Sequence, residues 1–253
     1  MVNIMNNVVY GFILTIFAGL STMLGTILVF FNSKNEKIIV KSLSFAAGVM
    51  ITVSIIDLIP ESYSLLRNLY PSFPTILYIL IFVVIGIIIS MLIDKYLPNS
   101  YSSESDLYRI GIISMLAIIL HNIPEGIATF MASNSDIKLG LSLGIAIALH
   151  NIPEGISISI PIYYSTKSRG KALLYTFISG ISEPFGALIT YLFLKPFVSN
   201  RVMGFLFSMI AGIMIQISIY ELIPEAKKYN SKKQMLLWIL IGTLFMLISH
   251  FIF

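Results

Sequence analysis

The seven residues HNIPEGI occur twice in this chain, at His121–Ile127 and at His150–Ile156. The second copy begins 29 residues after the first, and the copies hold two of the chain's three histidines. Residues four apart share one face of an α-helix, so the histidine and the glutamate of each copy project together. Imidazole nitrogen with carboxylate oxygen is a donor set that suits Zn²⁺ and divalent ions such as Fe²⁺, Mn²⁺ or Cd²⁺.

More potential ligands accompany these pairs. Asn122 and Asn151 follow the two histidines, and Glu183 lies at the centre of a third apolar segment. Ionisable side chains at membrane depth are costly unless they are paired, so they are functional candidates by default. The three carboxylates could hold more than one divalent ion, which would offset their desolvation. The candidate ligands at mid-depth are therefore His121, Asn122, Glu125, His150, Asn151, Glu154 and Glu183.

Other interpretations of single residues remain open at this stage. One intramembrane His–Glu pair is about as often a structural hydrogen bond or a proton relay as a ligand pair, although two copies plus Glu183 disfavour that interpretation. Asn122 and Asn151 could instead join neighbouring helices. A methionine on an apolar face, such as Met50, usually serves packing. His250, near the end of the last predicted helix, is expected at the membrane interface.

The elements that position these residues must be membrane helices. The chain is 57% hydrophobic and 11% charged, with a mean hydropathy of +0.92, which is too apolar for a soluble protein of this length. It has no cysteine, so disulfides and thiolate ligands are excluded. We expect one all-α, polytopic transmembrane domain over residues 1–253. Its eight helices are predicted over residues 7–31, 40–62, 74–97, 109–131, 139–162, 171–195, 201–225 and 233–253.

The basic residues predict the orientation of these helices. Of the 16 lysines and arginines, 12 fall in the odd-numbered loops and 4 in the even-numbered loops. The positive-inside rule then places the odd loops in the cytoplasm and both termini outside the cell or in the periplasm. The net charge of +4 follows from these loops and indicates a lipid bilayer rather than a nucleic acid as partner. The most polar stretch, Pro98–Arg109, is predicted to be a linker.

A second repeat relates distant helices. Ala46–Glu61 and Ile210–Glu225 are identical at ten of 16 aligned positions. Phe17–Gly25 and Ser179–Gly186 are similar more weakly. The second and seventh helices cross the membrane in opposite directions, as do the two HNIPEGI helices. We therefore predict inverted repeats, in which helices 1–3 are related to helices 6–8 and helix 4 to helix 5, an architecture of many secondary transporters.

Acidic residues also lie at both ends of the predicted path. Asp57 and Glu61 lie toward the outer end of the second helix, and Glu221 and Glu225 toward the inner end of the seventh. Acidic groups at each mouth of a cation path attract and pass on divalent ions. An alternative for Glu61 and Glu225 is that they are simply solvated at helix ends.

These motifs resemble those of the ZIP (Zrt/Irt-like) metal transporters, and the stretch from His150 to Leu194 is similar to their bacterial ZupT-like branch. The resemblance extends over essentially the whole chain. It implies a two-metal site to which the fourth, fifth and sixth helices contribute the seven candidate ligands above. Met50 matches a second-helix position that contacts metal in some members, and Asp57 and Glu221 match acids at the entrance and exit. The family's histidine-rich third loop is absent here, so metal sensing by that loop is not implied.

The resemblance further implies uptake of a divalent metal through the cell membrane, with Zn²⁺ as the first candidate and Fe²⁺, Mn²⁺, Co²⁺ or Cd²⁺ as others. An elevator-like motion of one helix bundle against another is the favoured mechanism of the family, and homodimers are common in it. A metal-selective channel is the alternative. A membrane metalloenzyme is disfavoured because the HExxH signature is absent, so no catalytic residue or catalytic cofactor is expected.

Overall fold

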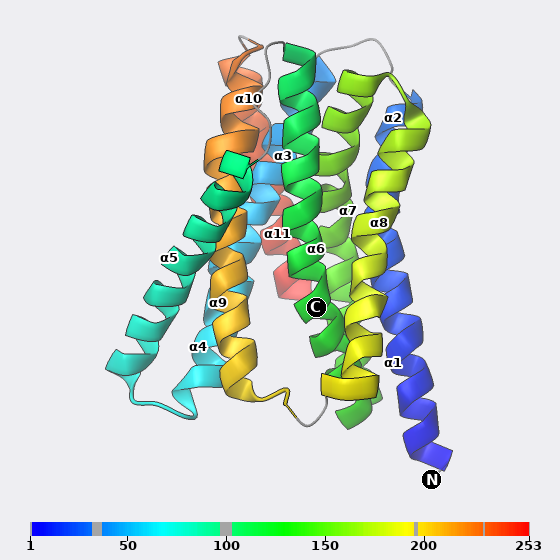
Figure 1. The fold of residues 1–253 in the computed structure, drawn as a ribbon, viewed down its shortest axis with the longest axis vertical. Coiled ribbons are helices and arrows are strands. Elements are labelled where there is room, and N and C mark those ends of the chain that lie inside the picture. Colours follow the sequence, from blue (N-terminus) through cyan, green and yellow to red (C-terminus); the bar gives the residue numbers. More distant parts are fainter. Residues whose placement is uncertain (1, 32–36, 97–102, 195–196, 230, 253) are drawn as a thin grey trace.

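The computed structural model describes the chain except for residues 1, 32–36, 97–102, 195–196, 230 and 253. The residues described form helices and short connections, with no β-strand among them (Figure 1). Eight of these helices are long and apolar enough to cross a membrane, which confirms the predicted number. They extend over Asn7–Phe30, Lys37–Arg67, Ser72–Tyr96, Asp106–Ser135, Ile137–Thr166, Arg169–Leu194, Asn200–Lys227 and Lys232–Ile252.

Several of these spans are divided, because short 3₁₀ or π turns interrupt their α-helical hydrogen bonding. In chain order the elements are α1 (Val2–Ser21), the 3₁₀ turn η1 (Thr22–Thr26), α2 (Ile27–Phe31), α3 (Lys37–Val53), the π turn η2 (Ser54–Leu58), α4 (Ile59–Arg67), α5 (Ser72–Tyr96), α6 (Ser103–Ser135), α7 (Ile137–Thr166), α8 (Arg169–Ile189), the π turn η3 (Thr190–Leu194), α9 (Asn200–Ile217), the π turn η4 (Ser218–Leu222), α10 (Ile223–Lys227) and α11 (Lys232–Ile252).

The helices form two bundles that lie side by side (Figure 1). The first bundle contains α1, α6, α7 and α8, and the second contains α3, α4, α5, α9, α10 and α11. The bundles meet mainly where α7 packs against α3 and α6 against α9. We call the end at which α4 and α6 finish and α7 and α9 begin the lower face, and the opposite end the upper face, as Figure 1 is drawn.

Two π turns occupy matching places in the segments that are similar in sequence. η2 contains Asp57, η4 contains Glu221, and the two turns are 164 positions apart. Each is followed by a proline in the first turn of the next helix, Pro60 or Pro224. A proline has no N–H to offer the carbonyl one turn before it, so the hydrogen-bond register of that turn is easily widened. The sequence similarity between these segments therefore extends to their local backbone geometry.

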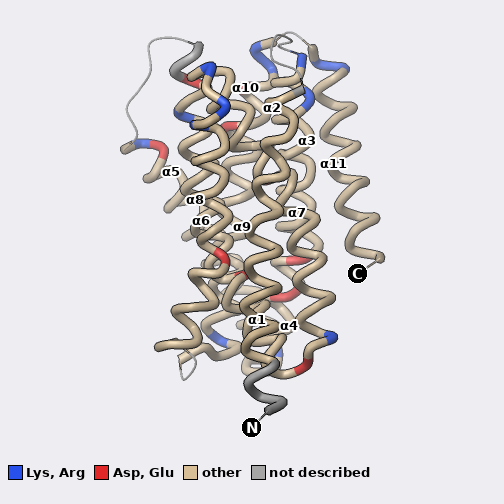
Figure 2. Tube along the Cα trace, turned by 90° about the vertical axis from the view of Figure 1, so that its right-hand side faces the viewer, with Lys and Arg blue, Asp and Glu red and all other residues tan. Residues whose placement is uncertain are grey.

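The prediction of a linker over Pro98–Arg109 is wrong for the part that the structure describes. α6 already begins at Ser103. Two ion pairs engage the polar side chains of this first part of the helix: Arg109 lies 2.5 Å from Asp94, and Asp106 lies 2.9 Å from Lys228. Polar residues here extend a membrane helix beyond its apolar span instead of ending it. Figure 2 shows that lysines and arginines gather at this upper face.

Candidate metal centre

The two HNIPEGI copies meet at the middle of the first bundle. Nε2 of His121 lies 3.1 Å from Oε1 of Glu125 and 3.3 Å from Oε1 of Glu154 on the neighbouring helix. Nε2 of His150 lies 2.9 Å from the same Oε1 of Glu125. Ligand atoms of His121, Glu125 and His150 all lie within 4.8 Å of one another. Each copy therefore supplies groups to one shared cluster, and Glu125 lies between the two histidines.

This cluster is buried, and many of its polar atoms have no hydrogen-bond partner. The four side chains are between 0% and 6% exposed. The atoms without any partner include Nδ1 of both histidines, Oε2 of Glu125 and Oε2 of Glu154. A buried polar group without a partner costs about 1–3 kcal/mol, and more if it is charged. A bound cation would satisfy the carboxylate oxygens together, with one nitrogen of each imidazole as a further electron-pair donor.

The two asparagines hold the neighbouring helices through their amide nitrogens. Nδ2 of Asn122 donates to the carbonyl of Ser179 on α8 at 3.2 Å, and Nδ2 of Asn151 donates to the carbonyl of Ala18 on α1 at 2.9 Å. The Oδ1 atoms of both asparagines are buried and unpartnered. The predicted role as helix-joining residues is therefore confirmed for the nitrogens, and it leaves each oxygen available as a ligand.

Glu183 lies beside the cluster because α6 and α8 pack closely against each other. A Cβ at Gly126 would overlap the backbone carbonyl of Glu183, so only glycine permits this crossing. Oε2 of Glu183 accepts a hydrogen bond of 2.9 Å from Nδ2 of Asn151, and its Oε1 is unpartnered. The side chain is completely buried. The third mid-depth carboxylate is thus joined to the second HNIPEGI copy.

A cavity of about 860 Å³ connects the cluster with the lower face. It lies between the two bundles and is lined at its inner end by Glu125 and His150. Asp57 and Glu61, the acids predicted at the entrance, line the same cavity. The arrangement provides a mostly apolar route, with three acidic side chains along it, from one face of the protein to a buried His–Glu cluster.

Comparison with known proteins agrees with this geometry. The sequence model of the family described as ZIP Zinc transporter matches residues 98–250. A protein of Chlorobium chlorochromatii named zinc transporter ZupT is 40% identical, over 98% of this chain and 99% of its own. Proteins with the same name from Clostridium perfringens and Streptococcus mutans are 39% and 40% identical, over 98% and 96% of this chain and 98% and 97% of their own. The chain belongs to the ZIP family.

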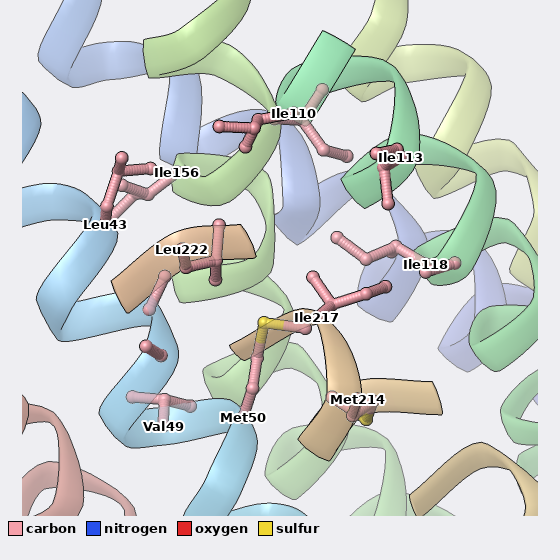
Figure 3. Packing of buried hydrophobic residues seen from close by; sticks show 14 of the residues in the cluster. Leu43, Val49, Met50, Ile110, Ile113, Ile118, Ile156, Met214, Ile217 and Leu222 are labelled. Atoms are coloured by element: carbon pink, nitrogen blue, oxygen red, sulfur yellow. The ribbon is translucent and has the colours of Figure 1, made fainter. Parts of the chain in front are cut away.

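In this ZIP protein the remaining candidate ligand, Met50, is completely buried in the main apolar cluster. Figure 3 shows its sulfur beside Ile217 of α9, and Met214 lies nearby. Its surroundings there are apolar side chains from both bundles. These surroundings match the packing role that methionine usually has, and a role as a ligand stays a prediction.

The acids predicted at the exit lie toward the upper face of the ZIP fold, where Glu225 belongs to an ion network. Glu225 is 2% exposed and lies 2.7 Å from Lys228, which also pairs with Asp106 of α6. Partial burial lowers the pKa of Lys228, but its hydrogen bonds to Glu225 and Asp106 outweigh this effect, so the pKa lies above its ordinary value. Glu225 is therefore not a solvated residue at a helix end. Glu221 is also nearly buried, in η4.

His250, which is expected at the membrane interface, has a partner that the sequence does not predict. Its Nδ1 lies 2.5 Å from Oδ1 of Asp57, and both residues line the cavity that leads to the cluster. Sequence reasoning placed this histidine at the membrane interface because it is close to the end of its helix. The low number of histidines could have suggested this position, because only three occur in the chain. Two of them were already assigned to a metal path, so the third was a candidate for the same path.

Proposed function

We propose that this protein transports Zn²⁺ into the cytoplasm through the cell membrane, with other divalent ions such as Fe²⁺, Mn²⁺, Co²⁺ and Cd²⁺ as further substrates. The observation that carries the proposal is the buried cluster of His121, Glu125, His150 and Glu154 at the inner end of a cavity. Its relatives named zinc transporters support zinc as the first substrate. The metal is the cargo, and the proposed role of these side chains is to replace its hydration shell.

We further propose that the site holds two ions. The cluster offers two groups of donors. His121, Glu125, His150 and Glu154 lie around the shared oxygen of Glu125, whereas Glu183 is linked to Asn151. Oδ1 of Asn151 and Oε1 of Glu183 are buried and unpartnered, as is Oδ1 of Asn122. The second group could take a second ion with oxygen ligands only, which suits a harder cation or one that keeps some water.

The contacts of the HNIPEGI helices support an inverted repeat. Asn122 of the first copy bonds to Ser179, and Asn151 of the second copy bonds to Ala18. Ser179 and Ala18 are 161 positions apart and match each other in the weaker repeat of the first and sixth helices. Equivalent asparagines therefore hold equivalent backbone positions, as a pseudo-two-fold axis requires.

Two glycines contact the two motif copies in the same symmetric way. A Cβ at Gly186 of α8 would overlap the carbonyl of Ile123, and one at Gly25 of η1 would crowd Ile152. Ile123 and Ile152 are the matching residues of the two motif copies, and Gly25 and Gly186 are again 161 positions apart. We infer that helices 1–3 and 6–8 are inverted repeats around helices 4 and 5. With lysines and arginines at the upper face, this face is assigned to the cytoplasm and both termini to the outside.

The path is closed between the centre and the upper face. Apolar side chains of both bundles pack together there (Figure 3). The first bundle contributes Ile110, Ile113, Ile118 and Ile156, and the second contributes Leu43, Val49, Met50, Met214, Ile217 and Leu222. A path that is open on one side and closed by packed side chains on the other supports alternating access over a continuous channel. All seven mid-depth candidates belong to the first bundle, so they can move together relative to the second.

Uptake of zinc into proteoliposomes that contain a zinc-sensitive dye tests the transport proposal. The unmodified protein should show saturable uptake, and His150→Ala should abolish it, because this substitution removes a ligand atom that lies 2.9 Å from Glu125. Competition by Fe²⁺, Mn²⁺, Co²⁺ and Cd²⁺ gives the order of preference. The transport proposal fails if the unmodified protein does not take up zinc, and the assignment of the site fails if His150→Ala retains the full rate.

Ion pairs between the bundles should stabilise the state with the lower cavity open. Arg109 of α6 pairs with Asp94 of α5 across the bundle interface. Loss of this ion pair should destabilise the state with the lower cavity open by about 1 kcal/mol. The equilibrium constant then shifts about fivefold toward the state that is open at the upper face. The chain has no cysteine, so Ala146→Cys places a single thiol in the cavity. In a background with Arg109→Ala, this thiol should react more slowly with a membrane-impermeant maleimide, by at most about fivefold, because the rate follows the population of the state with the lower cavity open. An unchanged rate would show that the ion pair does not favour this state.

A further inference from the structure

Thr22, in the first membrane span, matches Glu183 of α8 in position. The two residues are 161 positions apart, which is the separation of the other matched positions in the weaker repeat. Their backbones make equivalent contacts, because a Cβ at Gly155 would overlap the carbonyl of Thr22, just as a Cβ at Gly126 would overlap that of Glu183. The first span also changes from α1 to the 3₁₀ turn η1 at Thr22, and such a change within a helix often marks a functional position.

Thr22 lies close to the point at which α1 and α8 cross. Gly19 and Gly180 are also 161 positions apart, and a Cβ at either glycine would overlap the carbonyl of the other. In the inverted repeat proposed above, matching residues that touch each other lie at the pseudo-two-fold axis. A Cβ at Gly180 would meet the Cβ of Thr22 at 3.4 Å. Thr22 and Glu183 therefore lie on either side of this axis, and each packs against the glycine that follows a motif glutamate.

These two matched side chains differ in reach and in charge. The carboxylate of Glu183 extends to Asn151 and accepts its hydrogen bond of 2.9 Å. The hydroxyl of Thr22 is two bonds shorter and neutral, and its Oγ1 is buried without a partner. The same holds for Oδ1 of Asn122, the residue that matches Asn151 in the first motif copy. Buried oxygens without partners are destabilising, so two of them beside a metal centre indicate a ligand that donates hydrogen bonds.

A water molecule on a metal ion is a ligand of this kind. The second ion proposed above has only oxygen ligands from the protein, so it keeps water in its remaining positions. We propose that Thr22 belongs to the metal centre, where its hydroxyl and Oδ1 of Asn122 accept hydrogen bonds from a water on this second ion. The inference rests on the proposed two-ion site and adds to it a residue without charge. Three carboxylates then face the four charges of two divalent ions, which favours their release.

Zinc binding to the detergent-solubilised protein tests this role. Thr22→Val keeps the shape of the side chain and removes the hydroxyl. It should weaken binding of the more weakly held zinc ion about tenfold, because groups that orient the ligands of a metal typically contribute at least that much to affinity. Thr22→Ser keeps the hydroxyl and should bind zinc within about twofold of the unmodified protein. Unchanged zinc affinity in Thr22→Val, or equal weakening in Thr22→Ser, would overturn the proposal.

The same helix provides a matched control. Thr15 is completely buried in α1, but its hydroxyl donates to the carbonyl of Phe12 at 3.0 Å. Thr15→Val should therefore leave both zinc affinities unchanged. If it weakens zinc binding as much as Thr22→Val does, the loss comes from a disturbed α1, and Thr22 has no particular role at the centre.

A thiol at position 22 gives a signal that a purely structural role would not produce. The chain has no cysteine, so Thr22→Cys introduces a single sulfur. Cd²⁺ should bind this sulfur as a thiolate in place of the water, since soft ions prefer sulfur ligands. The expected result is an ultraviolet charge-transfer absorption from the cadmium–thiolate bond, which Thr15→Cys should not show. Absence of the absorption from Thr22→Cys would place this side chain away from the centre and refute the proposal.

Failure of this inference can be distinguished from failure of the proposed function. If the unmodified protein binds a single zinc ion, the two-ion proposal fails. The affinity of that ion in Thr22→Val and the cadmium signal of Thr22→Cys then still decide whether Thr22 belongs to the centre. If the unmodified protein binds zinc but does not take it up into proteoliposomes, only the transport proposal fails.

Discussion

Replacing Glu125 with alanine is expected to lower zinc uptake by about 100-fold or more. The reason is that one oxygen of this carboxylate lies 2.9 Å from His150 and 3.1 Å from His121, so its loss removes the group that the two motif copies share. The two histidines would then face each other without an anion between them, and the charge of a bound cation would be less well compensated. Uptake into proteoliposomes and zinc binding to the detergent-solubilised protein both measure the effect.

A buried hydroxyl on the same helix provides the control. Oγ of Ser133 donates to the carbonyl of Thr129 within α6, two turns beyond Glu125, and the side chain is completely buried. Ser133→Ala should therefore keep uptake within about twofold of the unmodified protein. If Glu125→Ala binds and transports zinc as the unmodified protein does, the shared carboxylate is not a ligand. The ion path must then lie elsewhere in the first bundle.

Much of the buried cluster could be predicted because its information is local. The spacing of His121 and Glu125 on one helix, repeated at His150 and Glu154, already requires two pairs of the same composition. Long apolar runs predict the membrane helices, and these two helices are consecutive, so they are antiparallel neighbours. The structure places the pairs within hydrogen-bond distance of each other, as this reasoning expects.

The pairing of His250 with Asp57 could not be read in the same way. The two residues are 193 positions apart and do not match each other in either repeat, so only the packing of α11 against α3 brings them together. Polar residues near a helix end have two outcomes that the sequence does not distinguish, namely solvation and pairing. The same ambiguity explains Asp106 and Arg109, which were assigned to a linker and instead form ion pairs in a helix. The π turns were also not foreseen, because one proline permits several local geometries.

Gly155→Ala is expected to disrupt both the fold and the centre. A Cβ at this position would overlap the backbone carbonyl of Thr22 in η1, and a backbone atom cannot move aside by a rotamer change. α7 and α1 would have to separate, and Asn151 on α7 would lose its hydrogen bond to Ala18. We expect a cost of about 3 kcal/mol and at least a tenfold loss of zinc uptake. Thermal unfolding in detergent and uptake into proteoliposomes measure the two effects.

The same helix contains a glycine that separates this effect from a general intolerance of alanine. A Cβ at Gly144 would meet Leu14 and Thr129 at 3.5 Å or more, which is ordinary van der Waals contact. Gly144→Ala should therefore leave Tm and uptake near those of the unmodified protein, or raise Tm slightly, since alanine favours the helix. If both alanine variants behave alike, the close crossing of α7 and η1 does not position Asn151. If only Gly155→Ala loses uptake, the distance between these helices is part of what builds the metal centre.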